Sequence, residues 1–232
     1  MKTLILAAAA LTAATSASAV TLYSEDFSGQ NGKGAVGVSG GAPTVDTSGV
    51  TWTLDLFFSG LIAGSDFAQV QDEAFVAQDT NGALNWLSPV IDISGFTSLE
   101  LSIDISEEGD LEGPGSGANT DFLNISASSD GGSTFSLFPN VGGFGNAFTS
   151  LSGNAPDDDD FGSVAFSGAV DDGSAFQLLL SVSTSAGSER IIFDNIVLTG
   201  DAVVAPVPLP ASTVLLLGAV AGLAGLRRTR RG

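Results

Sequence analysis

Strict alternation of apolar and polar residues is the feature that most restricts the fold of this chain. The stretch Leu99–Ser106 alternates without exception over eight residues. Residues 50–56 alternate too, and residues 176–182 and 191–198 are more apolar. A period of two puts alternate side chains on opposite faces of a strand, and no stretch has the period of an amphipathic helix. The sequence therefore predicts an all-β domain, an antiparallel β-sandwich that is jelly-roll-like.

The N-terminus has the three parts of a secretory signal peptide. Lys2 supplies a positive charge, an apolar run covers residues 4–11, and Ala17-Ser18-Ala19 is an A-x-A cleavage pattern. We therefore predict a signal peptide over residues 1–19 and export of the chain.

The C-terminus carries a short apolar segment between prolines and arginines. Residues 213–226 would form a helix of about 21 Å at 1.5 Å per residue, against a bilayer core of about 30 Å. Four arginines lie within residues 227–232, and the positive-inside rule keeps them cytoplasmic. We predict one transmembrane helix at 213–226, a basic cytoplasmic tail at 227–232, and a proline-rich linker at 201–212. The remaining domain, residues 20–200, then lies outside the inner membrane.

The motif in that linker resembles a known sorting signal. Val207, Pro208, Leu209, Pro210 and Ala211, followed by the apolar helix and the arginines, resemble the VPLPA-CTERM tail, a variant of the PEP-CTERM signals of Gram-negative bacteria. The resemblance implies an exosortase partner, final delivery to the cell surface or extracellular matrix, and association with exopolysaccharide. A sortase signal fits less well because the Thr and Gly of LPxTG are out of place. An ordinary, unprocessed membrane anchor is the alternative.

Charge limits the partners of the domain. Residues 20–205 contain all 26 acidic residues of the chain and only two basic ones, Lys33 and Arg190, a formal charge of −24. Such a surface repels phosphates, so nucleic acid is excluded as a partner, and it attracts divalent cations.

The chain has no cysteine and no histidine. Disulfides, Cys- or His-based zinc sites, Ser-His-Asp triads and cysteine nucleophiles are therefore excluded. Carboxylates and hydroxyls remain for any chemistry, and we predict that the domain is not an enzyme.

A second resemblance concerns the domain itself. Residues 87–95, the turn Ser129-Asp130-Gly131-Gly132, and the closing Phe193-Asp194-Asn195-Ile196 are similar to bacterial jelly-roll modules of the MAM and carbohydrate-binding type. This resemblance implies a surface module, structural or ligand-binding, with exopolysaccharide as a ligand. A carbohydrate-binding module proper is the first alternative function.

Two sets of candidate site residues follow. Glu25, Asp26 and Asp194 lie near the two ends of the domain, where the first and last strands of a sandwich often pair, and Ca²⁺ prefers such oxygen ligands. Similar modules carry calcium near their termini, so we predict a calcium site there. Trp86 is a candidate for stacking on a sugar, whereas Trp52 lies on the apolar face of its strand and is expected in the core.

An acidic loop provides the second alternative function. Glu107, Glu108, Asp110 and Glu112, with Asp121, could supply the two carboxylates that a glycoside hydrolase needs. A weak cation site or a solvated loop explains the same residues.

Overall fold

The structure, a computed structural model, describes residues 19–109, 111, 121–138, 164–203 and 219. Residues 1–18, the sorting motif Val207–Ala211, the predicted transmembrane segment apart from Ala219, and the basic tail lie outside the described residues. No helix within the described part of the chain is long and apolar enough to cross a membrane.

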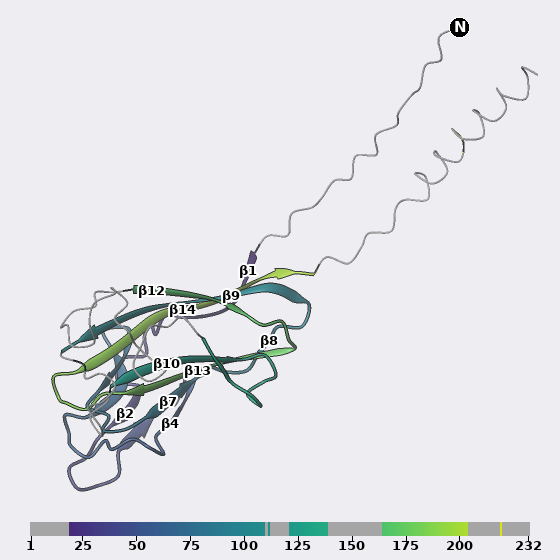
Figure 1. The fold of residues 1–232 in the computed structure, drawn as a ribbon. Coiled ribbons are helices and arrows are strands. Elements are labelled where there is room, and N and C mark those ends of the chain that lie inside the picture. The colour runs from purple at the N-terminus through teal and green to yellow at the C-terminus, as the bar shows by residue number, and fades with distance from the viewer. Residues whose placement is uncertain (1–18, 110, 112–120, 139–163, 204–218, 220–232) are drawn as a thin grey trace, which may run out of the picture. The chain divides into compact units, whose positions relative to one another are not determined.

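Two antiparallel sheets form the domain and confirm the predicted β-sandwich (Figure 1). The large sheet has the order β12-β9-β14-β6-β5-β2-β3, with β1 also paired to β14. Its strands are β1 (Ala19–Glu25), β2 (Gly34–Val36), β3 (Thr44–Asp46), β5 (Phe67–Gln71), β6 (Ala74–Gln78), β9 (Phe96–Glu108), β12 (Val164–Val170) and β14 (Arg190–Ala202).

The small sheet has the order β11-β10-β13-β7-β4, with β8 also paired to β13. Its strands are β4 (Thr53–Asp55), β7 (Leu84–Leu87), β8 (Ile91–Asp92), β10 (Phe122–Ser128), β11 (Ser136–Leu137) and β13 (Ala175–Ser183). Figure 1 shows the two sheets as layers, with β12, β9 and β14 above β10, β13 and β7.

Alternation in the sequence becomes alternation in burial. On β9, Leu99, Leu101, Ile103 and Ile105 are at most 2% exposed, while the residues between them face outward. Every second side chain of β9 therefore points toward the other sheet. The strands β13 and β14 show the same alternation in burial. The alternating stretch at 50–56 yields only the three-residue strand β4.

Five aromatic rings fill the centre of the sandwich. They come from both sheets and adjoining segments, and each is at most 1% exposed: Phe27, Trp52, Phe75, Trp86 and Phe193. Phe75 and Phe193 stack with ring centroids 4.8 Å apart, and most of the other pairs meet edge to face. We call these five residues the ring cluster.

The first and last strands lie side by side, as the sequence predicted. β1 runs antiparallel to β14, with Ala19 opposite Asp201 and Glu25 opposite Ile196. The same side of β14 pairs with β6 over residues 190–193. A register shift in β14 follows Asp194, where Asn195 has a positive φ of 48°.

Candidate functional site

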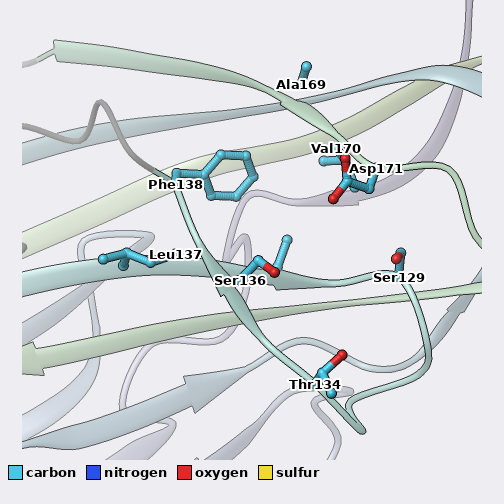
Figure 2. Close-up of a pocket in the computed structure, with 9 residues that line it drawn as sticks. Ser129, Thr134, Ser136, Leu137, Phe138, Ala169, Val170 and Asp171 are labelled. Atoms are coloured by element: carbon cyan, nitrogen blue, oxygen red, sulfur yellow. The ribbon is translucent and has the colours of Figure 1, made fainter.

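A cleft opens where the β11 edge of the small sheet approaches β12 of the large sheet (Figure 2). It has a volume of about 200 Å³. The side chains around it come from two parts of the chain, the 127–138 segment and the end of β12: Ala127, Ser129, Thr134, Ser136, Leu137, Phe138, Ala169, Val170 and Asp171.

A tight turn between β10 and β11 positions the hydroxyl side of the cleft. Asp130 Oδ1 accepts hydrogen bonds from the Ser128 hydroxyl at 2.6 Å and from the backbone N–H groups of Ser133 and Thr134 at 3.0 and 2.9 Å. Its Oδ2 accepts a bond from the Thr134 hydroxyl at 2.7 Å. These bonds, the Ser128 hydroxyl first, lower the pKa of Asp130 to about 2. The ionised carboxylate therefore holds the turn that carries Thr134.

Phe138 forms an apolar wall of the cleft. Its ring meets Phe166 edge to face at 5.3 Å, and its backbone N–H donates to Ile125 O at 3.0 Å. A Cβ atom on Gly168 would lie 2.8 Å from the Phe138 ring, so β12 needs glycine at this point. Glycine thus lets the ring lie flat against β12.

The cleft combines the groups that bind a polyhydroxylated molecule. Ser129, Thr134 and Ser136 bring hydroxyls, Asp171 brings a carboxylate, and Phe138 brings an aromatic surface (Figure 2). Hydroxyls and carboxylates fix orientation by hydrogen bonding, while an apolar wall contributes contact area. Glycosidases need two carboxylates about 5–9.5 Å apart, and Asp171 is the single carboxylate among the described residues that line the cleft.

Trp86 lies in the ring cluster rather than on the surface. Its side chain is 0% exposed and its indole Nε1 has no hydrogen-bond partner among the described residues. Trp52 is also buried, as predicted, but its Nε1 donates to Gln30 Oε1 at 2.8 Å. In this structure Trp86 therefore offers no exposed face on which a sugar could stack. A contact with sugar has to be sought at other residues.

Glu25 and Asp26 of the predicted calcium site accept hydrogen bonds from the turn that follows β1. Glu25 is 8% exposed, and its Oε1 accepts hydrogen bonds from the Phe27 backbone N–H at 2.9 Å and from Gln30 Nε2 at 2.8 Å. Asp26 caps the same turn through the Ser28 N–H at 3.1 Å. Glu25 thus holds the turn that follows β1, whereas the negative charge of Asp26 acts on the carboxyl group of Asp194.

Asp194 sits in a group of carboxylates on the outer face of the large sheet. Burial raises its pKa, the Asn195 N–H opposes that rise, and the charges of Asp104, Asp26 and Glu73 raise it further. Asp104 lies directly opposite Asp194 in the β9–β14 pairing, and Asn195 Nδ2 donates to Asp104 Oδ2 at 2.9 Å.

A shallow hollow adjoins these side chains, with Asp104, Asp194 and Asn195 in its lining. The described residues contain no group of three or more Asp, Glu, His or Cys side chains arranged to hold a metal ion. Calcium binding at Glu25, Asp26 and Asp194 stays a prediction.

The acidic loop is described only in part. Asp110 and Glu112 lie outside the described residues. Glu107 and Glu108 end β9, and Glu108 Oε2 forms an ion pair with Arg190 at 2.8 Å. Asp121 is 0% exposed at the start of β10. Its burial sets Asp121 apart from the solvent-facing Glu108, so these two residues do not form a shared surface site.

Sequence reasoning identified the Asp130 turn but missed the cleft beside it. Phe138 and Asp171 stand 33 positions apart in the sequence and carry no recognisable motif. They meet because β11 and β12 belong to different sheets whose edges come together. Only the serine- and threonine-rich stretch at 133–136 could have pointed to this region.

No family model matches the chain, and no curated protein matches it. Among solved structures, the K3 adhesin domain of Lys-gingipain from Porphyromonas gingivalis is similar over 78% of this chain and 99% of its own, at 12% identity and a TM-score of 0.40. A family 29 carbohydrate-binding module matches over 65% of this chain and 90% of its own, at 17% identity and a TM-score of 0.32. The Clostridium thermocellum xylanase 10B CBM22-1–GH10 modules match over 81% of this chain and 30% of their own, at 12% identity and a TM-score of 0.31. These likenesses are loose, so we base function on the residues of this chain.

Proposed function

We propose that this chain is an exported surface or matrix protein whose β-sandwich binds polysaccharide in the cleft between β11 and β12, without cleaving it. The observation that carries this proposal is the composition of the cleft. Three hydroxyl side chains, one carboxylate and one aromatic ring line the cleft, and hydrogen bonds to Asp130 hold the turn that carries Thr134.

The charge of the domain favours a neutral polysaccharide. Both basic side chains of residues 20–205 are in ion pairs, Lys33 with Asp46 and Arg190 with Glu108, each at 2.8 Å. A domain with a formal charge of −24 and no basic patch repels an anionic polymer. We therefore expect binding of neutral polymers and weak or no binding of anionic ones.

Delivery to the surface belongs to the same proposal. The signal peptide at 1–19 would start export, the helix at 213–226 would hold the chain in the inner membrane, and an exosortase would act at Val207–Ala211. The motif, the apolar segment and the arginines stand in the order that such a sorting signal requires. An unprocessed anchor would leave the protein in the membrane fraction.

Binding can be tested on the mature protein by electrophoresis through gels that contain a polysaccharide. We expect retardation by the exopolysaccharide of the producing strain or by neutral polymers such as xylan and galactomannan, and little by anionic alginate. Asp171→Asn should weaken retardation by about tenfold, the loss that about 1.4 kcal/mol produces.

Asp172→Asn is the matched control, because it removes the same charge from an exposed neighbour that does not line the cleft. Equal effects of the two variants, or no binding of any polymer by the wild type, would overturn the proposal.

Sorting needs a separate test. Mass spectrometry of protein released from cells should find no peptide beyond the Val207–Ala211 region. Replacement of Pro208 and Pro210 should trap the protein in the membrane fraction, since proline keeps this segment out of a continuous helix. An intact released chain that ends at Gly232 would favour the plain anchor.

Glycoside hydrolysis is a second candidate because of one observation. Asp104 and Asp194 face each other across β9 and β14, and the pKa of Asp194 is raised, as a general acid requires. An assay of new reducing ends on the same polymers tests this candidate. Turnover that Asp194→Asn abolishes would favour hydrolysis, whereas we expect no turnover.

A further inference from the structure

The loop between β4 and β5 exposes an unusual pair of aromatic rings. Phe57 is 81% exposed and Phe58 67% exposed, with their ring centroids 4.7 Å apart at 89°. Ile62 in the same loop is 65% exposed. Contiguous exposed apolar side chains of this size mark interaction surfaces on soluble domains more often than scattered single residues do.

Buried side chains and backbone hydrogen bonds hold the loop that carries these rings. Asp66, 1% exposed, accepts hydrogen bonds through Oδ2 from the backbone N–H groups of Ile62 and Ala63 at 3.0 and 2.7 Å. Leu61 is 2% exposed and anchors the loop in the sandwich, and the Gly60 N–H donates to Thr80 O at 2.7 Å.

A glycine makes close packing against Phe58 possible. Gly82 has a φ of 140°, and a Cβ atom there would lie 2.2 Å from the Phe58 carbonyl oxygen. The chain thus accepts a constrained backbone in order to support Phe58. A loop backbone that is held in place before binding loses little conformational entropy when a partner arrives.

Polar groups stand next to the rings. Asp55 Oδ1 accepts a hydrogen bond from the Phe57 N–H at 3.0 Å, and Asn85 Nδ2 donates to Asp55 Oδ2 at 3.4 Å. Asp55 is exposed and Asn85 half-buried. Flat apolar rings beside a carboxylate and an amide match the two sides of a pyranose, its C–H face and its hydroxyl edge.

The same surroundings argue against other occupants. The acidic domain repels an anionic lipid surface, and it repels a second copy of itself. A neutral sugar carries no charge and can approach through the aromatic rings.

The loop with Phe57 and Phe58 and the cleft at β11 lie at opposite edges of the small sheet. The loop follows β4 at one edge of the small sheet, and the cleft lies at β11, the opposite edge. Four interstrand steps of about 4.8 Å separate β11 from β4, about 19 Å across the sheet.

We propose that Phe57 and Phe58, with Asp55 and Asn85, form a second polysaccharide contact, so that one molecule cross-links two segments of neutral polymer. This inference rests on the proposed function, which supplies the first contact. Two weak contacts at opposite edges would join polymer segments that neither contact could join alone.

The test measures binding and cross-linking separately on the mature protein. The probe is the neutral polymer that retards the wild type most, for example galactomannan, with gel retardation for binding and solution viscosity for cross-linking. The wild type should raise viscosity. The double variant Phe57→Ala/Phe58→Ala should keep the retardation that depends on Asp171 but lose the rise in viscosity.

Asp171→Asn is the reciprocal arm, and it should keep the retardation that depends on the rings while also losing the rise in viscosity. Val45→Ala, which trims an apolar side chain 49% exposed on β3, is the control and should change neither reading. Thermal melts should show all three variants folded, because surface substitutions usually change stability by within about 0.5 kcal/mol.

Three results decide the inference. If the ring variant raises viscosity as the wild type does, or if Asp171→Asn abolishes all retardation, the second contact is absent while the proposed function stands. If the wild type binds no polymer, the proposed function fails first. Loss of viscosity in both variants, with part of the retardation kept in each, supports the second contact.

Discussion

The ring cluster and the Phe57–Phe58 pair use the same kinds of residue for opposite purposes. Each ring of the cluster is at most 1% exposed and contacts other rings from both sheets, whereas Phe57 and Phe58 are mostly exposed and contact each other. Packing holds the rings of the cluster, whereas the Asp66 carboxylate holds the backbone of Ile62 and Ala63 in the loop that carries the surface pair. An aromatic residue therefore reveals its role through what surrounds it, and through its type only in part.

The largest expected difference between the two sets is in stability. Phe193→Ala should lower the free energy of unfolding by about 3–5 kcal/mol, because it leaves a cavity among buried rings. Phe58→Ala should change it by less than about 0.5 kcal/mol, since that ring already lies in water. Urea unfolding of both variants checks the comparison, and a similar loss in both would mean that the surface pair also stabilises the fold.

Asp194, directly after Phe193 in the chain, lies on the outer face of β14, and its predicted role in calcium binding can be tested in the same way. If the predicted calcium site at Glu25, Asp26 and Asp194 exists, CaCl₂ should raise the melting temperature beyond NaCl of equal ionic strength. The gain would be about 2.7 kcal/mol at a hundredfold excess over Kd. Asp194→Asn should remove that gain and Asp172→Asn should keep it. Equal melting curves in the two salts would leave only screening of the acidic surface.

The two buried tryptophans divide the ring cluster further. Trp52→Phe removes the hydrogen bond from Nε1 to Gln30, whereas Trp86→Phe removes an N–H group that has no partner among the described residues. Both variants lose similar ring area, so Trp52→Phe should cost about 1 kcal/mol more than Trp86→Phe. Thermal melts of the two single variants test this, and a greater loss for Trp86→Phe would contradict it.

The smallest expected effect is on stability, from Asp79, whose carboxyl group interacts with that of Asp66 in the loop before β5. Burial and then the charge of Asp66 raise the pKa of Asp79, so its ionised form is disfavoured in the folded state. Above that raised pKa the folded state carries a penalty, which fades as the pH falls and Asp79 takes up a proton. Asp79→Asn should therefore raise the free energy of unfolding at pH 7 by less than about 1 kcal/mol, seen as a higher melting temperature, and the gain should shrink in acid. A gain that grows in acid would have the wrong sign.

The sequence predicted the strands of the sandwich better than the residues that would contact a ligand. Alternation predicted the cores of β9, β13 and β14, and the pairing of β1 with β14 was expected from their places in the chain. Trp86 was harder to interpret, although Leu84 and Trp86 are buried on one face of β7 while Asn85 and Leu87 face the other way. A four-residue strand is too short for its period to separate core from surface.

The candidate contacts depend on tertiary structure that no short pattern contains. Phe57 and Phe58 follow an apolar-polar alternation and read as its continuation, yet the chain turns away after Asp55. Their exposure depends on Asp66 and Gly82, which lie 8 and 24 positions beyond Phe58. Asp104 and Asp194 lie opposite each other because of the β9–β14 register, directly before a register shift at Asn195, and sequence spacing predicts neither the register nor the shift.

The pairing of β14 also determines how the domain would bear mechanical load. A load applied at Ala202 along the axis of β14 would act on a strand that is bonded to β9 on one side and to β1 and β6 on the other. Force along the axis of a strand must shear many backbone hydrogen bonds at once, whereas force across the strands would open them one at a time. If the proposed C-terminal tether loads β14 along its axis, the domain should withstand a larger force than under a load across its strands.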